Sequence, residues 1–219
     1  MNRWKNVGRL LLTFPLAASA VAASQSVDQG TIIVRQGGQE IGRESFRYLP
    51  SVSGADSLFI TARYPDSKPL AILTAGHQRH PTAGVAFQLD FKSPQGVRQV
   101  YAATVRGRIA VRSVAPGSES AREYPDGPRV VILDDSLFAL FLHPARLAKP
   151  SGEQLTAIYP RSGKRLAFTA TGDPKSGGTR IVLTGGLSGT IDLDNQGRLM
   201  RVEFPAQEVE AIRLTDEGD

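Results

Sequence analysis

The stretch "TIIVRQGGQEIGRESFRY", residues 31–48, indicates how this chain folds. Two runs rich in β-branched and aromatic residues, 31–36 and 40–48, flank the pair Gly37-Gly38. A Gly-Gly pair between two such runs is a strong hairpin signal, because two-residue hairpin turns require positive φ angles that glycine adopts freely. The sequence therefore predicts an antiparallel hairpin at this point.

The rest of the chain repeats this pattern of short β-runs and turn signals. Val, Ile, Thr, Phe and Tyr fill the runs, while Gly and Pro fall mostly between them. The further runs are residues 58–64, 70–75, 85–91, 97–105, 108–114, 129–134, 154–159, 165–171, 179–185, 189–194, 198–204 and 208–214. This pattern predicts an all-β protein with a curved, mainly antiparallel sheet.

Two stretches depart from the pattern of short β-runs. Residues 115–128, "APGSESAREYPDGP", are rich in Pro, Ser and charge, and they predict a mobile loop. Residues 134–148, "DDSLFALFLHPARLA", predict a short helix over 136–143, with Asp135 or Ser136 as its cap. Leu and Phe surround this helix on nearly all sides, so it must be buried, and we expect it on the concave face of the sheet. A buried strand is the alternative, since periodicity does not distinguish the two in so short a run.

The first 23 residues have the pattern of a secretory signal peptide. Three basic residues precede an apolar stretch, residues 10–22, that is shorter than the about 20 residues needed to span a bilayer. A small-residue A-x-A site at 20–22 favours cleavage over the alternative, an uncleaved anchor. We therefore expect a signal peptide at 1–23, a single β-rich domain at 24–214 and a frayed tail at 215–219, with no transmembrane segment after cleavage.

Composition narrows the classes of function. The chain has no Cys, which excludes disulfides, catalytic thiols and thiolate metal sites. It carries 26 basic and 21 acidic residues, and three of the basic ones lie in the signal peptide, which leaves a net charge of about +2. The remaining Lys and Arg are scattered, so nucleic-acid binding is not expected. An exported chain without disulfides fits a bacterial periplasm.

A calcium-loop pattern runs from Asp192 to Glu203, with acids at positions 1 and 3, Gly at 6 and Glu at 12. A calcium loop of this kind needs flanking helices, but three glycines lie in residues 185–190, and Pro205 follows closely. The flanking residues instead alternate between apolar and polar, as in strands. We expect a β-hairpin closed by a type I turn over 194–197, with a bulge because the loop is odd in length.

The other chemical motifs are weak. His77 and His80 form an H-x-x-H pair in a turn, and His143 is the only other histidine, so a surface turn is favoured over a zinc site. The serines in residues 117–121 and 186–190 lie in incomplete G-x-S-x-G patterns. The sequence predicts no catalytic residue, no metal ligand and no cofactor.

Both ends of the expected domain resemble a family of exported bacterial β-rich domains of unknown function. The opening "GTIIVRQGGQEIGRESFRY" is similar to their first hairpin, and "GTIDLDNQGRLMRVEFPAQEVEAIR" is similar to their last. Their architecture is similar to the half-barrel of periplasmic lipoprotein carriers. The resemblance implies a half-barrel or open barrel with one short buried helix. Gly42, Gly197 and Arg198 match the family pattern as structural residues, and no catalytic residue is carried over.

The favoured hypothesis is a non-enzymatic periplasmic protein that binds an apolar ligand, such as a lipid, an acyl chain or another hydrophobic small molecule, in the concavity of the sheet. Phe138, Leu140 and Phe141 are the expected ligand-binding residues. One alternative is a hydrolase-type enzyme with a loop site near His77 and His80, in which Asp134 also takes part. Another is an envelope-assembly protein whose sheet edge accepts a strand from a partner, which the sequence does not identify.

Overall fold

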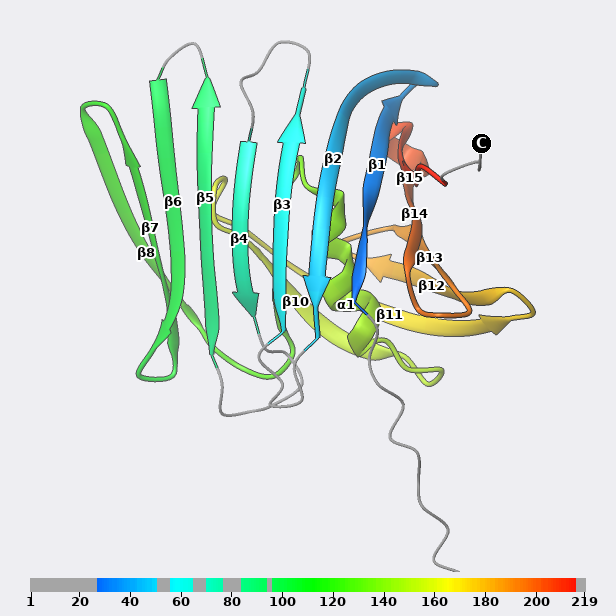
Figure 1. Ribbon diagram of the computed structural model, residues 1–219. Coiled ribbons are helices and arrows are strands. Elements are labelled where there is room, and N and C mark those ends of the chain that lie inside the picture. The colour runs from blue at the N-terminus through cyan, green and yellow to red at the C-terminus, as the bar shows by residue number, and fades with distance from the viewer. Residues whose placement is uncertain (1–26, 51–55, 65–69, 77–83, 94–95, 216–219) are drawn as a thin grey trace, which may run out of the picture.

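The computed structural model describes residues 27–50, 56–64, 70–76, 84–93 and 96–215 (Figure 1). The expected signal peptide, both His77 and His80, and all of the expected tail except Thr215 lie outside these described residues.

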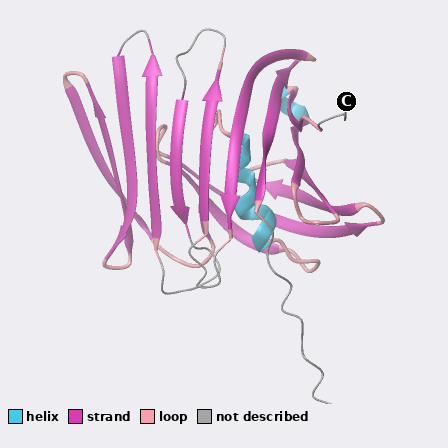
Figure 2. Ribbon diagram, in the orientation of Figure 1, coloured by secondary structure: helices cyan, strands magenta, loops and turns pink. Residues whose placement is uncertain are grey.

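The described strands form one 15-stranded sheet in the order β8-β7-β6-β5-β4-β3-β2-β1-β15-β14-β13-β12-β11-β10-β9. Figure 2 shows that strands make up most of the described structure and that helices are short. The first half of the sheet comprises β1 Asp28–Gln36, β2 Gln39–Leu49, β3 Ser57–Arg63, β4 Leu70–Gly76, β5 Val85–Ser93, β6 Gly96–Val105, β7 Arg108–Ala115 and β8 Ser118–Pro125. The second half comprises β9 Val130–Ile132, β10 Glu153–Tyr159, β11 Lys164–Lys175, β12 Gly178–Gly185, β13 Gly189–Asp194, β14 Leu199–Phe204 and β15 Val209–Arg213.

The topology is two meanders joined by the first and last strands. Strands β1 to β8 pair with their sequence neighbours, as do β9 to β15, and β1 pairs with β15. In the described part of the chain, β8 pairs only with β7 and β9 only with β10, so the sheet does not close into a barrel. The expected fold class, an all-β curved and open sheet with one short buried helix, is confirmed.

One parallel pair explains where the helix lies. Strand β9 runs parallel to residues 156–158 of β10, whereas the other strand pairs are antiparallel. Parallel neighbours need a long crossover connection, usually a helix that covers one face of the sheet. Here the crossover contains a 3-10 helix, η1 Phe138–Phe141, followed by α1 Leu142–Leu147. Figure 1 shows this helical segment between the wall of β1–β3 and the curled strands β10–β13.

Alternation along the strands defines an inner and an outer face. In β2, Glu44, Phe46 and Tyr48 are buried, while Ser45 and Arg47 between them are exposed. Strand β3 follows the same period of two. The apolar inner faces and the helical segment together form one hydrophobic core.

The predicted helix exists, but its bounds differ from 136–143. It begins at Phe138 and continues through Pro144 to Leu147. Pro144 is tolerated because it lies in the first turn of α1, where the backbone N–H that proline lacks is not needed by the helix. The alternative, a buried strand, is wrong.

The predicted helix caps are also wrong. The N-cap position is Leu137, and its side chain makes no capping hydrogen bond. Asp135 instead forms an ion pair with Lys164 at 3.6 Å, and Ser136 lies before the cap. The reason is tertiary, because Glu44 of β2 accepts the first helical N–H groups and no local cap is needed.

The predicted loop at 115–128 is wrong, because most of it forms β8. Arg108 pairs with Glu123 and Arg112 with Glu119 across β7 and β8, each at 2.7 Å. Backbone pairing with β7 therefore overrides the loop-like composition. All residues of β8 except one are exposed, which explains the high content of Ser and charge.

The hairpin formed by β13 and β14 confirms the interpretation of the calcium-like pattern. Gly197 has a φ of 74°, and the register shifts at Asp192/Leu193, as a bulge requires. The Asp194 carboxylate accepts the N–H groups of Gln196 and Arg198, both at 2.9 Å. Asp194 is thus occupied by the turn itself, and Asp192 is held by Arg180 of β12 at 2.7 and 2.9 Å.

The double substitution Asp192→Ala and Asp194→Ala is expected to leave calcium binding unchanged. A ligand that binds the native state raises the melting temperature, so the parent should melt at the same temperature in excess calcium and in chelator. Differential scanning calorimetry checks this. A calcium-dependent rise in melting temperature that the double variant abolishes would contradict the hairpin interpretation.

Candidate functional site

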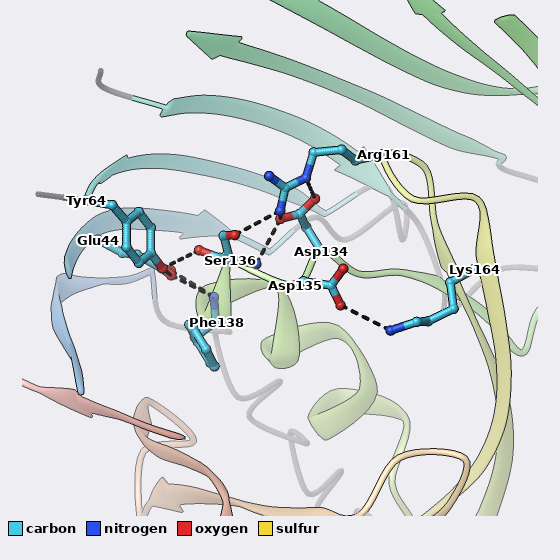
Figure 3. Close-up of polar contacts among 8 residues, drawn as sticks. All are labelled: Glu44, Tyr64, Asp134, Asp135, Ser136, Phe138, Arg161 and Lys164. Carbon is cyan, nitrogen blue, oxygen red and sulfur yellow. Dashed lines mark hydrogen bonds and ion pairs between the residues drawn. The ribbon is translucent and has the colours of Figure 1, made fainter. Parts of the chain in front are cut away.

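A buried glutamate on β2 holds the start of the inner helix. The Glu44 side chain lies on the inner face and its residue is 0% exposed. Its Oε1 and Oε2 accept the N–H of Phe138 at 2.8 and 3.0 Å, and Oε2 also accepts that of Ala139 at 3.0 Å (Figure 3). The first N–H groups of a helix have no partner within the helix. The carboxylate of Glu44 therefore caps η1, although it belongs to β2 and is distant from η1 in the sequence.

Tyr64 joins Glu44 to the segment that precedes the helix. Its hydroxyl donates to the carbonyl oxygen of Ser136 at 2.5 Å and lies 3.4 Å from Glu44 Oε1. A Cβ on Gly42 would lie 2.5 Å from the Tyr64 ring, so only glycine leaves space for this tyrosine. The sequence "IGRE", residues 41–44, thus supplies the space for the Tyr64 ring at Gly42 and the carboxylate of Glu44.

A second buried carboxylate lies on the same segment. Asp134 is 3% exposed and accepts two hydrogen bonds from Arg161, at 2.8 and 3.0 Å. Asp134 Oδ1 also accepts the N–H of Ser136 at 2.9 Å, and Arg161 donates to Ser136 Oγ at 2.8 Å. Figure 3 shows that Tyr64 and Arg161 both bond to Ser136, which connects the contacts of Glu44 with those of Asp134. We call Glu44, Tyr64, Asp134, Ser136 and Arg161 the helix anchor.

Burial dominates the electrostatics of the helix anchor. It raises the pKa of Glu44 to about 7, and the N–H groups of Phe138 and Ala139 only partly oppose it. Burial also raises the pKa of Asp134, against the opposing charge of Arg161. No histidine is bonded to the helix anchor within the described residues, and both carboxylates are engaged. The arrangement holds the start of the helix in place.

The three expected ligand-binding residues lie together in η1. Phe138, Leu140 and Phe141 are 6%, 0% and 3% exposed. The ring centroids of Phe138 and Phe141 are 6.4 Å apart, and that of Phe141 is 5.1 Å from the ring of Phe204 on β14. The structure thus places them in the core beside the helix anchor. Their contact with a ligand stays a prediction.

The remaining candidates contribute little to a site. His143 is 4% exposed and packs edge-on against Tyr48, with ring centroids 6.4 Å apart. Among the described residues, no group of three His, Cys, Asp or Glu side chains is placed to hold a metal ion. None of the described helices has the length and apolar character needed to cross a membrane.

Sequence reasoning missed Glu44, Tyr64 and Arg161. One signal for Glu44 was available, because its position in β2 has the same parity as Phe46 and Tyr48. A charged residue on the apolar face of a strand needs a buried partner. No comparable signal in the sequence connects Arg161 to Asp134.

Comparison of the chain with protein-family models, with curated proteins and with solved structures gave no match. The similarity to exported β-rich domains is therefore a prediction from the sequence.

Proposed function

We propose that this chain is a non-enzymatic protein of the bacterial periplasm that binds a lipid or another amphiphile with an acyl chain. The ligand would occupy the space between the curved sheet and the η1–α1 segment, in contact with Phe138, Leu140 and Phe141. The periplasmic location rests on the signal-peptide pattern and the absence of Cys.

The observation that carries the proposal is an apolar helical segment enclosed by a sheet that does not close. The ten residues from Phe138 to Leu147 take part in no strand pairing of the described sheet. This segment can therefore move without breaking any strand–strand hydrogen bond. Its displacement would expose a continuous apolar surface, and such surfaces mark sites for ligands.

The way the helical segment is attached supports the same proposal. Its start is held by hydrogen bonds to Glu44, a buried ionisable group. Hydrogen bonds to a buried carboxylate are directional and are lost over a short displacement, whereas strand pairing is cooperative along the whole sheet. The attachment thus suits an element that a ligand displaces.

A sheet edge that binds a partner strand is less well supported. Strand β8 is the longer free edge among the described strands. It carries Glu119, Arg122 and Glu123, so both of its faces are charged, and Pro125 ends it. Charged side chains and proline are typical of edges protected against strand addition. The hydrolase alternative rests on His77 and His80, outside the described residues, and has no further support.

Protein purified without detergent from envelope extracts is expected to carry an amphiphile with an acyl chain at close to one per chain. Native mass spectrometry measures the occupancy, and mass spectrometry of the extracted lipids identifies the ligand. The stripped protein should then bind a fluorescent fatty acid, and the extracted lipid should compete with it. Protein that carries no lipid and binds no acyl probe would exclude the proposed function.

A further inference from the structure

The inner face of the sheet changes from apolar to polar towards the β8 edge. One cross-strand row runs Leu89, Val100, Ser113, Ser120 from β5 to β8. Leu89 and Val100 are 0% exposed, whereas Ser113 is half-buried and Ser120 exposed. The order from a buried apolar end to an open hydroxyl end matches an amphiphile whose tail lies inside and whose headgroup lies at the edge.

Arginines line this polar end. A pocket of about 180 Å³ lies between the inner side of β6–β8 and the turn that joins β10 to β11. Arg98, Arg122 and Arg161 contribute to its lining from β6, β8 and that turn. We call it the arginine pocket. Its volume suits a phosphate or carboxylate group rather than a whole lipid.

The charge of the arginine pocket is only partly compensated. Arg98 and Arg122 form no ion pair with any residue that the structure describes, whereas Arg161 is paired with Asp134. Glu119 borders the pocket, but its carboxylate is held by Arg112 of β7, at 2.7 and 3.0 Å. Two arginines are thus available for an anion, together with nearby serine hydroxyls.

The walls of the pocket are held together from both sides. The Tyr124 hydroxyl of β8 donates to the carbonyl oxygen of Gly163 at 3.1 Å. An ideal Cβ on Gly163 would lie 1.6 Å from Arg122 Nη1, so the Arg122 guanidinium lies directly against this glycine. The Arg161 guanidinium stacks on Phe91, 5.2 Å from its ring centroid, and Phe91 is the cross-strand neighbour of Arg98. These contacts join β8, the turn between β10 and β11, and β5 around the pocket.

We infer that the arginine pocket binds the anionic headgroup, a phosphate or a carboxylate, of the amphiphile whose acyl chain lies against the apolar inner face. The inference rests on the proposed function and defines its ligand class. Arg98 and Arg122 supply charge-assisted hydrogen bonds that the free protein does not satisfy internally. Arg161 links the pocket to the helix anchor, because the same guanidinium binds Asp134 and Ser136.

The test uses three probes and two variants. The probes are dodecyl phosphate, the uncharged detergent dodecyl maltoside below its micelle concentration, and inorganic phosphate, each titrated by calorimetry at constant ionic strength. The test variant combines Arg98→Gln with Arg122→Gln. The matched control combines Arg47→Gln with Arg63→Gln, which removes the same charge from exposed positions on the outer face of β2 and β3, away from the pocket.

We expect the parent to bind dodecyl phosphate at least about tenfold more tightly than dodecyl maltoside, and the test variant to lose this advantage. The control variant should keep it. Weak binding of inorganic phosphate that the test variant abolishes would also support the pocket.

Equal affinity for the two dodecyl probes in the parent would overturn the inference and leave the proposed function standing. The inference also fails if the test variant keeps the preference for dodecyl phosphate. Equal affinity of the parent for inorganic phosphate and for dodecyl phosphate would retain the anion site and exclude the acyl-chain function. If no probe binds, both proposals are wrong.

Discussion

Phe138→Ala and Phe141→Ala are each expected to lower the free energy of unfolding by about 3–5 kcal/mol. Both side chains are almost fully buried, and both contact Phe204, with ring centroids 6.4 and 5.1 Å from it. Truncation would remove the aromatic contacts and leave a cavity, because the enclosing strands cannot collapse onto it. In the absence of ligand, the helical segment therefore acts as a plug that fills the core.

Chemical denaturation of the ligand-free variants measures this penalty. Phe59→Ala is the matched control, since Phe59 lies on β3 and is 43% exposed, and we expect it to cost less than about 1 kcal/mol. A penalty below about 1 kcal/mol for Phe138→Ala and Phe141→Ala as well would contradict the plug. The helical segment would then be a loosely held lid, and the loss should appear in affinity for the acyl probe instead.

Strands such as β2 and β3 were predictable because one face is buried and the other meets solvent. That condition imposes a period of two on the sequence, as in β2 and β3. Strand β8 was missed because neither of its faces is buried, so its composition has no reason to alternate. Its pairing with β7 comes from the hairpin and from cross-strand ion pairs such as Arg112–Glu119.

The helix anchor and the arginine pocket were not predictable in this way. Glu44 and Phe138 are 94 residues apart in the sequence, and Asp134 and Arg161 are 27 apart. No local pattern encodes such contacts, because they depend on how the sheet curls. The sequence did predict a buried apolar helix, since its composition alone requires burial. It did not predict which sheet residue would satisfy the first helical N–H groups.

Protonation of Glu44 is expected to stabilise the fold. Burial raises its folded-state pKa from the ordinary value of 4.5 to about 7, so the folded protein favours the protonated form. The stability that Glu44 contributes is therefore fully present below pH 4.5 and is lost as the pH rises through 7. The two pKa values differ by an amount that corresponds to about 3 kcal/mol.

Glu44→Gln isolates this effect, because the amide has nearly the same shape and does not titrate. Between pH 4.5 and 8, the free energy of unfolding of the parent should fall by about 3 kcal/mol relative to the variant. Urea titrations at several pH values measure the difference.

Glu40→Gln is the control on the same strand, since Arg43 lowers the pKa of Glu40 and places its titration below this window. A constant difference between parent and Glu44→Gln would mean that the N–H groups of Phe138 and Ala139 balance desolvation, and a parent that gains stability as the pH rises would mean that they outweigh it. Glu44 would then be a permanently ionised cap. Because burial raises the pKa of Glu44 to about 7, the stability of the fold is instead expected to fall as the pH rises through neutrality.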